Sequence, residues 1–297
     1  MNTHDVEAFL AVVDTGSIVG AAARLHLTQP GVTRRVQNLE LTLGIPLLDR
    51  QSKPLKPTAA GREAYLLCRR VIASVDDLKS GLEPDSPPRG DFRLGLTSFV
   101  GENAVAGSLD QMRELYPNLT LRVSSGWASD LLTQLREGRI DACSIFVPGS
   151  MEPPETLARD HLGTYPTLVV AAKSLGLPRQ VRLAEIAGLP WVLNQDGCGF
   201  RRVMRQALEV AHLPFNIAVE VPSSELRLSL VARGLGLGVT TSAVLQASPS
   251  RSALQVLEVE GFKEDIQGWL VHRPPAGRLA KPIAYLASTM REVFKQS

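Results

Sequence analysis

Hydrogen-bonding side chains recur at helical spacing in the segment that follows Thr28. Val32, Val36 and Leu39 lie three or four residues apart and are predicted to pack inward. The side chains left on the opposite face are Gln29, Pro30, Thr33, Arg34 and Gln37. Glutamine can pair with adenine and arginine with guanine through two hydrogen bonds, while threonine and proline can contact a thymine methyl group. This face predicts a helix that reads base edges in the major groove, although an ordinary solvent-facing helix has a similar composition.

Positive charge gathers around this predicted helix. The whole chain has a net charge of only +2, but residues 24–62 contain only two acidic residues, Glu40 and Asp49. The basic residues of the same interval are Arg24, Arg34, Arg35, Arg50, Lys53, Lys56 and Arg62. Within it, two apolar runs at 43–58 flank a basic, proline-containing tip, which predicts a hairpin or wing. Cations there would contact DNA phosphates, which position a protein without reading sequence. A solvated basic surface is the alternative.

Two further short helices are predicted to hold this face in place. The first has an apolar stripe formed by Val6, Phe9, Leu10 and Val13. The second, alanine-rich, covers 18–26, where small side chains allow a neighbouring helix to approach closely. Thr28 then caps the third helix, and Pro30 occupies its first turn. The order of elements is that of a helix-turn-helix.

A longer helix is predicted to begin after Thr58. Apolar residues recur along it at intervals of three and four: Ala60, Ala64, Leu67, Val71, Val75, Leu78 and Leu82. So regular a stripe on an exposed helix favours pairing with the same helix of a second copy. Packing of this helix against its own domain is the alternative.

The residues described so far carry a resemblance to a known family. The run GSIVGAAARLHLTQPGVTRRVQNLELTLGIPLLDR at 16–50, followed by LKPTAAG, resembles the DNA-binding domain of LysR-type transcriptional regulators almost position by position. Leu48 departs from the phenylalanine usual in that family. The resemblance implies base contacts by Gln29, Pro30, Thr33 and Arg34, and contacts near the DNA backbone by Arg50 and Lys53.

A proline-rich segment, EPDSPPRG at 83–90, separates this part from the rest and predicts a hinge. From Asp91 onward strand-like and helical patterns alternate, which predicts an α/β sheet with right-handed crossovers. A second set begins near Tyr165, and the last strand and helix are expected to return to the first lobe. This double crossover resembles the effector domain of the same family, which is similar to periplasmic solute-binding proteins.

The expected fold is therefore multidomain, α plus α/β, with a two-lobed α/β effector domain like that of periplasmic binding proteins. The expected bounds are 1–58 for the winged helix-turn-helix, 59–83 for the linker (dimerisation) helix, 84–90 for the hinge and 91–297 for the effector-binding domain. The first lobe would take 91–164 and 268–297, and the second 165–267.

Polar residues cluster in three loops that follow predicted strands of the two lobes. In open α/β sheets, ligands bind at the carboxyl ends of strands, where helix N-termini offer N–H groups. The residues expected to bind an effector are Thr97, Ser98, Trp127, Ser129, Asn194 and Cys198. Ser98 is favoured because the family resemblance implies an effector-binding serine or threonine there. A small anion such as a carboxylate is the expected guest, with Arg202 either supplying a counter-charge or facing solvent; plain helix capping is the alternative role for the hydroxyls.

Cysteine and histidine usage gives no sign of a metal or disulfide site. Cys68, Cys143 and Cys198 are far apart, and no histidine stands at metal-ligand spacing. A thiol at a helix N-terminus, as expected for Cys198, can have a lowered pKa and react. Peroxide-sensing members of the family use a cysteine in this region with a resolving partner, which the following helix lacks. A pocket cysteine without redox function is therefore expected.

Enzymatic motifs are not found in the sequence. The GLGLG run at 234–238 follows a predicted helix and lacks the GxGxxG spacing of a dinucleotide site, so it is expected to end a helix and lead into a strand. No P-loop, GxSxG or HExxH is present. Neither catalytic residues nor a cofactor are therefore expected.

The combined expectation is a ligand-responsive transcription regulator. Its partners would be double-stranded DNA with an inverted-repeat promoter site, a small-molecule effector, and further copies in a homodimer or homotetramer. The N-terminus is acidic where a signal peptide needs positive charge, and no apolar run is long enough to span a membrane, so a cytoplasmic protein without membrane partners is expected. An architectural DNA-binding protein without a ligand is the alternative.

Overall fold

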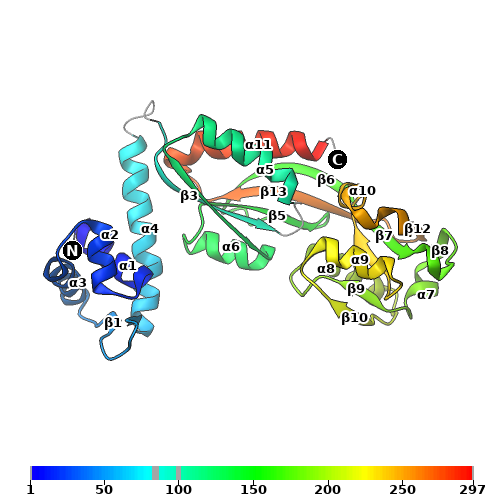
Figure 1. Cartoon of the computed structure of the whole chain (residues 1–297), viewed down its shortest axis with the longest axis horizontal. Helices are drawn as coiled ribbons and strands as arrows, with labels where there is room; N and C mark the ends of the chain where they lie inside the picture. The colour runs from blue at the N-terminus through cyan, green and yellow to red at the C-terminus, as the bar shows by residue number, and fades with distance from the viewer. Residues whose placement is uncertain (1, 82–86, 98–101, 296–297) are drawn as a thin grey trace. The chain divides into compact units, whose positions relative to one another are not determined.

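The computed structural model describes residues 2–81, 87–97 and 102–295 of the 297-residue chain. By its internal contacts the chain divides into two compact units. The first contains residues 1–86 together with Arg136–Arg139, and the second contains the remainder. Figure 1 colours the main part of the first unit from blue to cyan and the second from green to red.

Three helices pack together in the first unit: α1 (Thr3–Thr15), α2 (Ile18–Leu25) and α3 (Gln29–Leu43). The residue before each helix, Asn2, Ser17 or Thr28, accepts a hydrogen bond from a first-turn N–H group through its side chain. Phe9 and Leu39 are fully buried in the core that the three helices share. The three helices predicted from the sequence are confirmed.

A short antiparallel pair follows α3, formed by β1 (Leu48–Asp49) and β2 (Lys56–Pro57). Leu48 faces Pro57 across the pair and is buried in the helical core. The predicted wing is therefore present, and leucine takes the core position at which the family usually has phenylalanine. The long helix α4 (Ala59–Gly81) begins directly after β2.

The start of α4 is pressed against the chain that leads into the wing. The Thr58 hydroxyl donates to the Pro46 carbonyl oxygen (2.9 Å) and accepts from the Gly61 N–H (2.9 Å). A Cβ atom on Gly61 would lie 1.9 Å from the carbonyl oxygen of Leu47. Only glycine allows the helix and this backbone to approach so closely.

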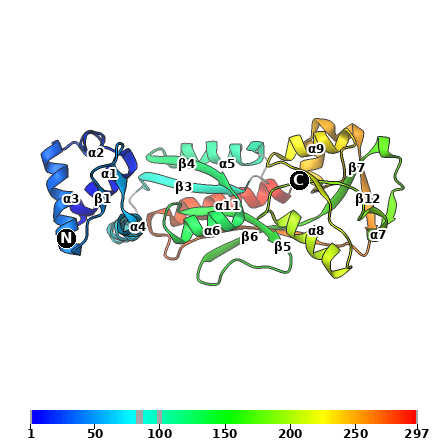
Figure 2. The same ribbon diagram turned by 90° about the horizontal axis from the view of Figure 1, so that it is seen from below.

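Five strands form the first sheet of the second unit: β3 (Gly90–Thr97), β4 (Leu119–Gly126), β5 (Ala142–Pro148), β6 (Ala158–Pro166) and β13 (Asp265–His272). Their order across the sheet is β4-β3-β5-β13-β6. β3 is parallel to β4 and β5, whereas β13 is antiparallel to both of its neighbours. Figures 1 and 2 show α5 (Glu102–Leu115) and α11 (Ala280–Lys295) over one face and α6 (Ala128–Arg136) over the other.

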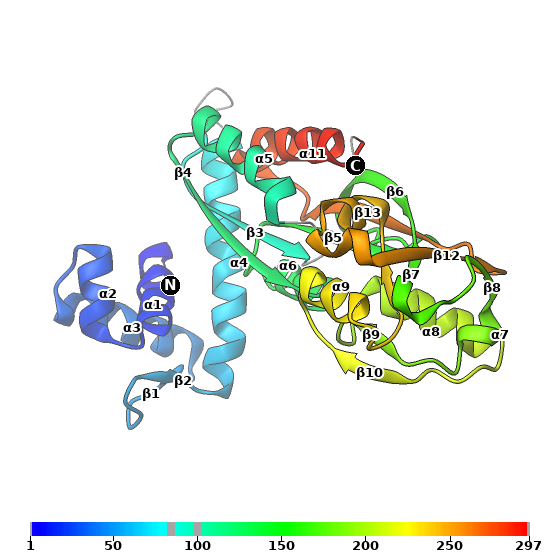
Figure 3. The same ribbon diagram turned by 45° about the vertical axis from the view of Figure 1, so that its right-hand side comes forward.

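The second lobe contains a four-stranded sheet in the order β11-β7-β12-β8 and a parallel pair, β10 with β9. The strands are β7 (Leu168–Ala172), β8 (Gln180–Arg182), β9 (Trp191–Leu193), β10 (Ile217–Glu220), β11 (Gly238–Thr240) and β12 (Leu254–Glu260). The helices are α7 (Leu183–Ile186), α8 (Gly199–Val210), α9 (Ser224–Ala232) and α10 (Ser242–Ala247). Figure 3 turns this lobe toward the reader.

The chain passes between the two sheets of the second unit twice, after β6 and after β12. The multidomain α plus α/β fold class is confirmed, as is the return of the last strand and helix to the first sheet. Because β13 enters that sheet between β5 and β6 in the opposite direction, the sheet is mixed rather than purely parallel. The sequence pattern did not predict β8, β12 or most of β6.

Candidate functional site

The exposed face of α3 carries the side chains that were predicted to read bases. Val32, Val36 and Leu39 are buried, and Thr28 caps the helix by accepting from the Gly31 N–H (3.2 Å). On the other side Gln29, Pro30, Arg34 and Gln37 are exposed and Thr33 is half-buried. The helix therefore presents its first two turns to a partner while its aliphatic side anchors it.

The turn between α2 and α3 fixes the direction in which α3 leaves the bundle. His26 has a left-handed backbone (φ 53°), and the Leu27 N–H donates to the Ala22 carbonyl (2.9 Å). Ser17 caps α2 through the Gly20 N–H (3.3 Å). Since α2 also packs against both of its neighbours, the tight turn and the helix packing together set the orientation of the exposed face of α3.

The two residues predicted to contact the DNA backbone, Arg50 and Lys53, have different surroundings. Lys53 is exposed between β1 and β2 and forms no ion pair within the described part of the chain. Arg50 pairs with Glu40 (2.9 Å), and Glu40 also accepts from the Leu47 N–H (2.8 Å). The Arg50 side chain remains 57% exposed, so it can meet a phosphate while keeping this pair. Arg24, in contrast, is engaged by Asp14 (2.8 Å).

A second candidate site is a cleft in the second unit. It is formed by the end of β3, the start of α6, the segment between β9 and α8, and α9. Four of the predicted effector-binding residues line it: Thr97, Trp127, Asn194 and Cys198. The space between its walls, open mouth included, is about 390 Å³. The free space enclosed by the walls is only about 20 Å³, which is room for about one water molecule, so the cleft is nearly closed in this structure.

The two other residues predicted to bind an effector are Ser129 and Ser98. Ser129 is exposed on the first turn of α6 and does not line the cleft, although a Cβ atom on Gly197 would lie 3.5 Å from its hydroxyl oxygen. It therefore stands at the rim. Ser98 lies outside the described residues.

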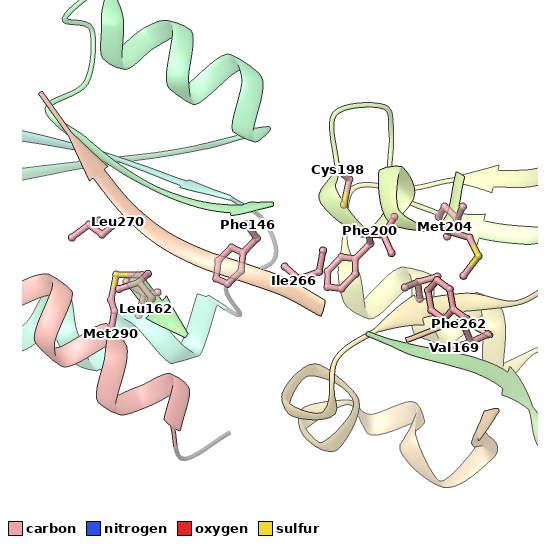
Figure 4. Packing of buried hydrophobic residues seen from close by; sticks show 14 of the residues in the cluster. Phe146, Leu162, Val169, Cys198, Phe200, Met204, Phe262, Ile266, Leu270 and Met290 are labelled. Carbon is pink, nitrogen blue, oxygen red and sulfur yellow. The ribbon is translucent and has the colours of Figure 1, made fainter. Parts of the chain in front are cut away.

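The floor of the cleft is apolar. Figure 4 shows Phe146 of β5 and Phe200 of α8 on either side of Ile266 of β13. All three are buried and line the cleft. An occupant would thus meet hydrocarbon as well as polar side chains.

A buried arginine that the sequence reasoning missed lines the same cleft. Arg227 on α9 is 1% exposed, and its Nη1 donates to Asn194 Oδ1 (2.6 Å). Arg202, the arginine considered from the sequence, is exposed and contacts Met151. The available signal was spacing, because Arg227 stands four residues before the buried Val231 and so shares the inward face of a predicted helix.

The cleft cysteine is held in its neutral form. Cys198 is the N-cap residue of α8 but makes no side-chain capping bond. Burial raises the pKa of its thiol, and the nearby Arg227 guanidinium and the N–H groups of Phe200 and Arg201 offset this only in part. Burial also raises the pKa of Cys143 to about 12. All three cysteines are free thiols.

Neither a metal-ligating cluster nor a membrane span occurs in the described part of the chain. Among the described residues, no three His, Cys, Asp or Glu side chains gather closely enough to hold a metal ion. Over the same ranges no helix is both long and apolar enough to cross a bilayer.

Two family models match the chain. The model of the bacterial regulatory helix-turn-helix protein, lysR family, matches residues 3–62, and the model of the LysR substrate binding domain matches residues 85–294. Among curated relatives, the HTH-type transcriptional activator CmpR of Synechocystis sp. is 25% identical over 275 residues, which is 91% of this chain and 88% of CmpR. The HTH-type transcriptional regulator CzcR of Bacillus anthracis is 26% identical over 237 residues, 80% of this chain and 79% of CzcR.

Solved structures match the fold over nearly the whole chain. A full-length OxyR variant from Pseudomonas aeruginosa has a TM-score of 0.77 at 18% identity, covering 98% of this chain and 95% of its own. Full-length CbnR in complex with its target DNA has a TM-score of 0.63 at 19% identity, covering 99% and 100%. At these identities the likeness concerns the arrangement of elements.

Proposed function

This chain belongs to the LysR family of transcriptional regulators, and on that premise we propose how its own residues bind DNA and sense a ligand. As a member it combines a DNA-binding helix-turn-helix with an effector-binding domain. In the proposed assignment residues 1–58 bind DNA, 59–83 pair two copies, 84–90 act as a hinge and 91–297 bind the effector.

In the proposed complex the first two turns of α3 enter the major groove. Gln29, Pro30, Thr33 and Arg34 approach base edges, while Arg50 and Lys53 meet phosphates. The single observation that carries this proposal is the division of α3 into a buried aliphatic side and an exposed side on which Gln29 and Arg34 stand.

The proposed assembly places two such helices on one site. A pair of copies joined through α4 would present two recognition helices to an inverted repeat, because half-site spacing mirrors the two-fold axis of a dimer. Leu67, Val71 and Leu78 are exposed along α4, which supports this pairing. Association of two dimers through the effector domains would give a homotetramer.

In the proposed mechanism a small-molecule effector, for which the sequence suggested a carboxylate, binds in the cleft lined by Thr97, Trp127, Asn194 and Cys198. A ligand that prefers one arrangement of the two lobes shifts the population toward it and so changes how the paired helices meet DNA. We assign the protein no catalytic step and no cofactor, and we place it in the cytoplasm with its DNA.

The test is selection of genomic fragments by the full-length protein, followed by DNase I footprinting over a series of salt concentrations. The expected result is a protected inverted repeat whose affinity falls as salt rises, because phosphate contacts release counterions. Absence of any salt-sensitive protection would contradict the proposal.

A further inference from the structure

The cleft contains a buried cation whose hydrogen bonds go to neutral groups. Arg227 donates from Nη1 to Asn194 Oδ1 (2.6 Å) and from Nη2 to Ser224 Oγ (3.4 Å). Its Nε–H is buried and has no hydrogen-bond partner within the described residues. Burial lowers the pKa of Arg227, but a guanidinium starts so far above neutral pH that it stays charged.

A neighbouring arginine shows how this chain otherwise handles a buried guanidinium. Arg201 on α8 is also buried, and its Nη1 donates to Glu220 Oε1 (2.6 Å) while Asp196 lies 3.3 Å from its Nε. Its charge is therefore compensated by carboxylates of the protein itself. Arg227 lines the cleft instead and faces no such group among the described residues.

Cys198 does not supply the missing negative charge. Its thiol lines the same cleft, but burial raises the pKa of Cys198, so the sulfur is protonated and neutral at ordinary pH. A buried charge without a partner is costly, and proteins that keep one provide a counter-ion. The counter-ion of Arg227 is thus expected to come from outside the chain.

A second polar group in the cleft also lacks a partner. Thr97, at the end of β3, is buried and lines the cleft, and its hydroxyl has no hydrogen-bond partner among the described residues. Two unsatisfied donors, one on a cation and one a hydroxyl, therefore belong to residues that line the same cleft. Buried polar groups are usually hydrogen-bonded, and an occupant with acceptor oxygens would supply a partner for both.

We propose that Arg227 is the anion receptor of the effector cleft and that the effector is a small organic carboxylate. This inference rests on the proposed function, since it takes the cleft to be the effector site. The carboxylate accepts from the Arg227 guanidinium, whose planar fork suits a two-oxygen anion, and from the Thr97 hydroxyl. The free space of about 20 Å³ is too small for the rest of the molecule, so the walls of the cleft move apart to let it lie on the apolar floor of Phe146, Phe200 and Ile266.

The experiment measures the melting temperature of the full-length protein with sodium acetate, butyrate and benzoate, at ionic strength matched with sodium chloride. Acetamide, butyramide and benzamide serve as neutral isosteres, and sulfate and phosphate as anions of tetrahedral shape. We expect at least one carboxylate to raise the melting temperature and its amide to leave it unchanged, because a ligand that binds only the folded state stabilises it.

Two variants test whether Arg227 is the residue that binds the carboxylate. Arg227→Gln removes the charge but keeps an amide that can donate to Asn194, and it is expected to abolish the shift. Arg202→Gln removes an equal charge from the exposed surface of α8, the preceding helix, and is expected to retain the shift in melting temperature. Should Arg227→Gln fail to fold, Thr97→Val, which removes only the hydroxyl, is expected to require more carboxylate for the same shift.

The outcomes separate this inference from the proposed function. A wild-type melting temperature that responds to no carboxylate, or that shifts equally in Arg227→Gln, overturns the inference. A response to sulfate and phosphate alone overturns the carboxylate assignment. DNA binding is measured on the same preparation: a protein that binds its inverted repeat yet ignores carboxylates contradicts only this inference, whereas one that binds carboxylates but no specific DNA contradicts only the proposed function.

Discussion

The surroundings of an arginine in this chain determine which partner its guanidinium can bind. Arg34 is exposed on α3 and forms no ion pair within the described part of the chain, so its guanidinium can reach a base edge. Arg50 is already held by Glu40, whereas Arg227 is buried against neutral acceptors. One residue type is therefore proposed to have three different tasks: reading a base, contacting a phosphate beside the wing and binding an effector.

Replacing two exposed cations of the first unit, Arg34 and Lys53, separates base reading from contact with the DNA backbone. Arg34→Ala is expected to cost about 1–3 kcal/mol at the specific site and to relax the preference at one base pair. Lys53→Ala should weaken binding to all DNA sequences alike. It should also reduce the steepness of log affinity against log salt concentration by about 1. Fluorescence anisotropy with single-base variants of the footprinted site, over several salt concentrations, checks both. Identical specificity profiles for the two variants would show that the roles are wrongly assigned.

A buried thiol is expected to make the first lobe less stable at alkaline pH. Burial raises the pKa of Cys143 from 9.0 to about 12. Above pH 9 the unfolded chain releases this proton while the folded one retains it, so the stability of the fold falls as pH rises from 9 toward about 12. A tenfold change in a proton-binding constant is worth about 1.4 kcal/mol, which sets the upper limit of the loss at about 4 kcal/mol.

Cys143→Ala tests this expectation by comparison with the wild type. The variant is expected to be the less stable protein at neutral pH, because it leaves a small cavity, and to lose less stability as the solution becomes alkaline. Melting temperatures of both proteins across this pH range check the prediction, and a pH-independent difference between them would refute it.

Residue-level prediction from the sequence worked where spacing or resemblance set the environment. Apolar spacing correctly assigned Val32, Val36 and Leu39 to the buried side of α3, and four of the six predicted cleft residues line the cleft. Arg227 was missed because charge normally marks a solvent-facing position, and its burial depends on the packing of α9 against the second lobe. The spacing of four residues from Val231 was the one local signal, and it is weaker than the usual preference of a charge for solvent.

At the level of elements, close approach of α4 to the wing depends on one small residue. The N-terminal turn of α4 can rest on the Leu47 backbone only because Gly61 has no side chain. Thr58 links the same two segments through its hydroxyl. The position of the wing beside α4 is thus fixed by direct backbone contact.

Gly61→Ala is expected to destabilise the first unit by roughly 1–3 kcal/mol, because the added methyl group overlaps the Leu47 carbonyl. It should also weaken DNA binding, since the wing must shift. Gly107→Ala in α5 is the matched control: a Cβ atom there meets nothing within 4 Å, so the change should stabilise the helix by about 0.5–1 kcal/mol. Thermal unfolding and DNA affinity check the pair, and equal effects at both glycines would contradict the contact.

Strands were predicted less completely than helices. The alternation in β3 and β4 was visible, and those elements were found, but β6 (Ala158–Pro166) mixes charged residues, glycine and aromatic residues without a clear period. Its strand conformation depends on pairing with β13, which is separated from it by the whole second lobe. Such long-range pairing leaves little trace in local composition.

At the scale of the whole molecule, α4 has two apolar faces. One face, with Ala64, Tyr65, Cys68 and Ile72, packs on the core of the first unit. The alternative prediction, that α4 packs against its own domain, is therefore correct for this face. Leu67, Val71 and Leu78 remain exposed along another face. Leu82, the last residue of the predicted stripe, lies outside the described residues. The exposed face is the one available to a second copy.

Val71→Glu places a charge in the middle of that face and is expected to shift the protein toward monomers. Affinity for a two-half-site DNA should fall about 10²-fold or more, since linking two binding modules can raise avidity by that factor. Lys79→Glu, an exposed site away from the stripe, should leave the oligomeric state unchanged. Analytical ultracentrifugation checks both variants, and an unchanged mass for Val71→Glu would rule out pairing through this face.

The place of β13 in the first sheet has a consequence for synthesis on the ribosome. β13 lies between β5 and β6 but is translated after the entire second lobe. A nascent chain therefore cannot complete its first lobe until the ribosome has synthesised almost the whole protein. Until then one edge of β5 and both edges of β6 have no strand to pair with, and open edges invite aggregation and proteolysis. A prematurely terminated product is thus expected to be degraded before it can compete for operators without responding to ligand.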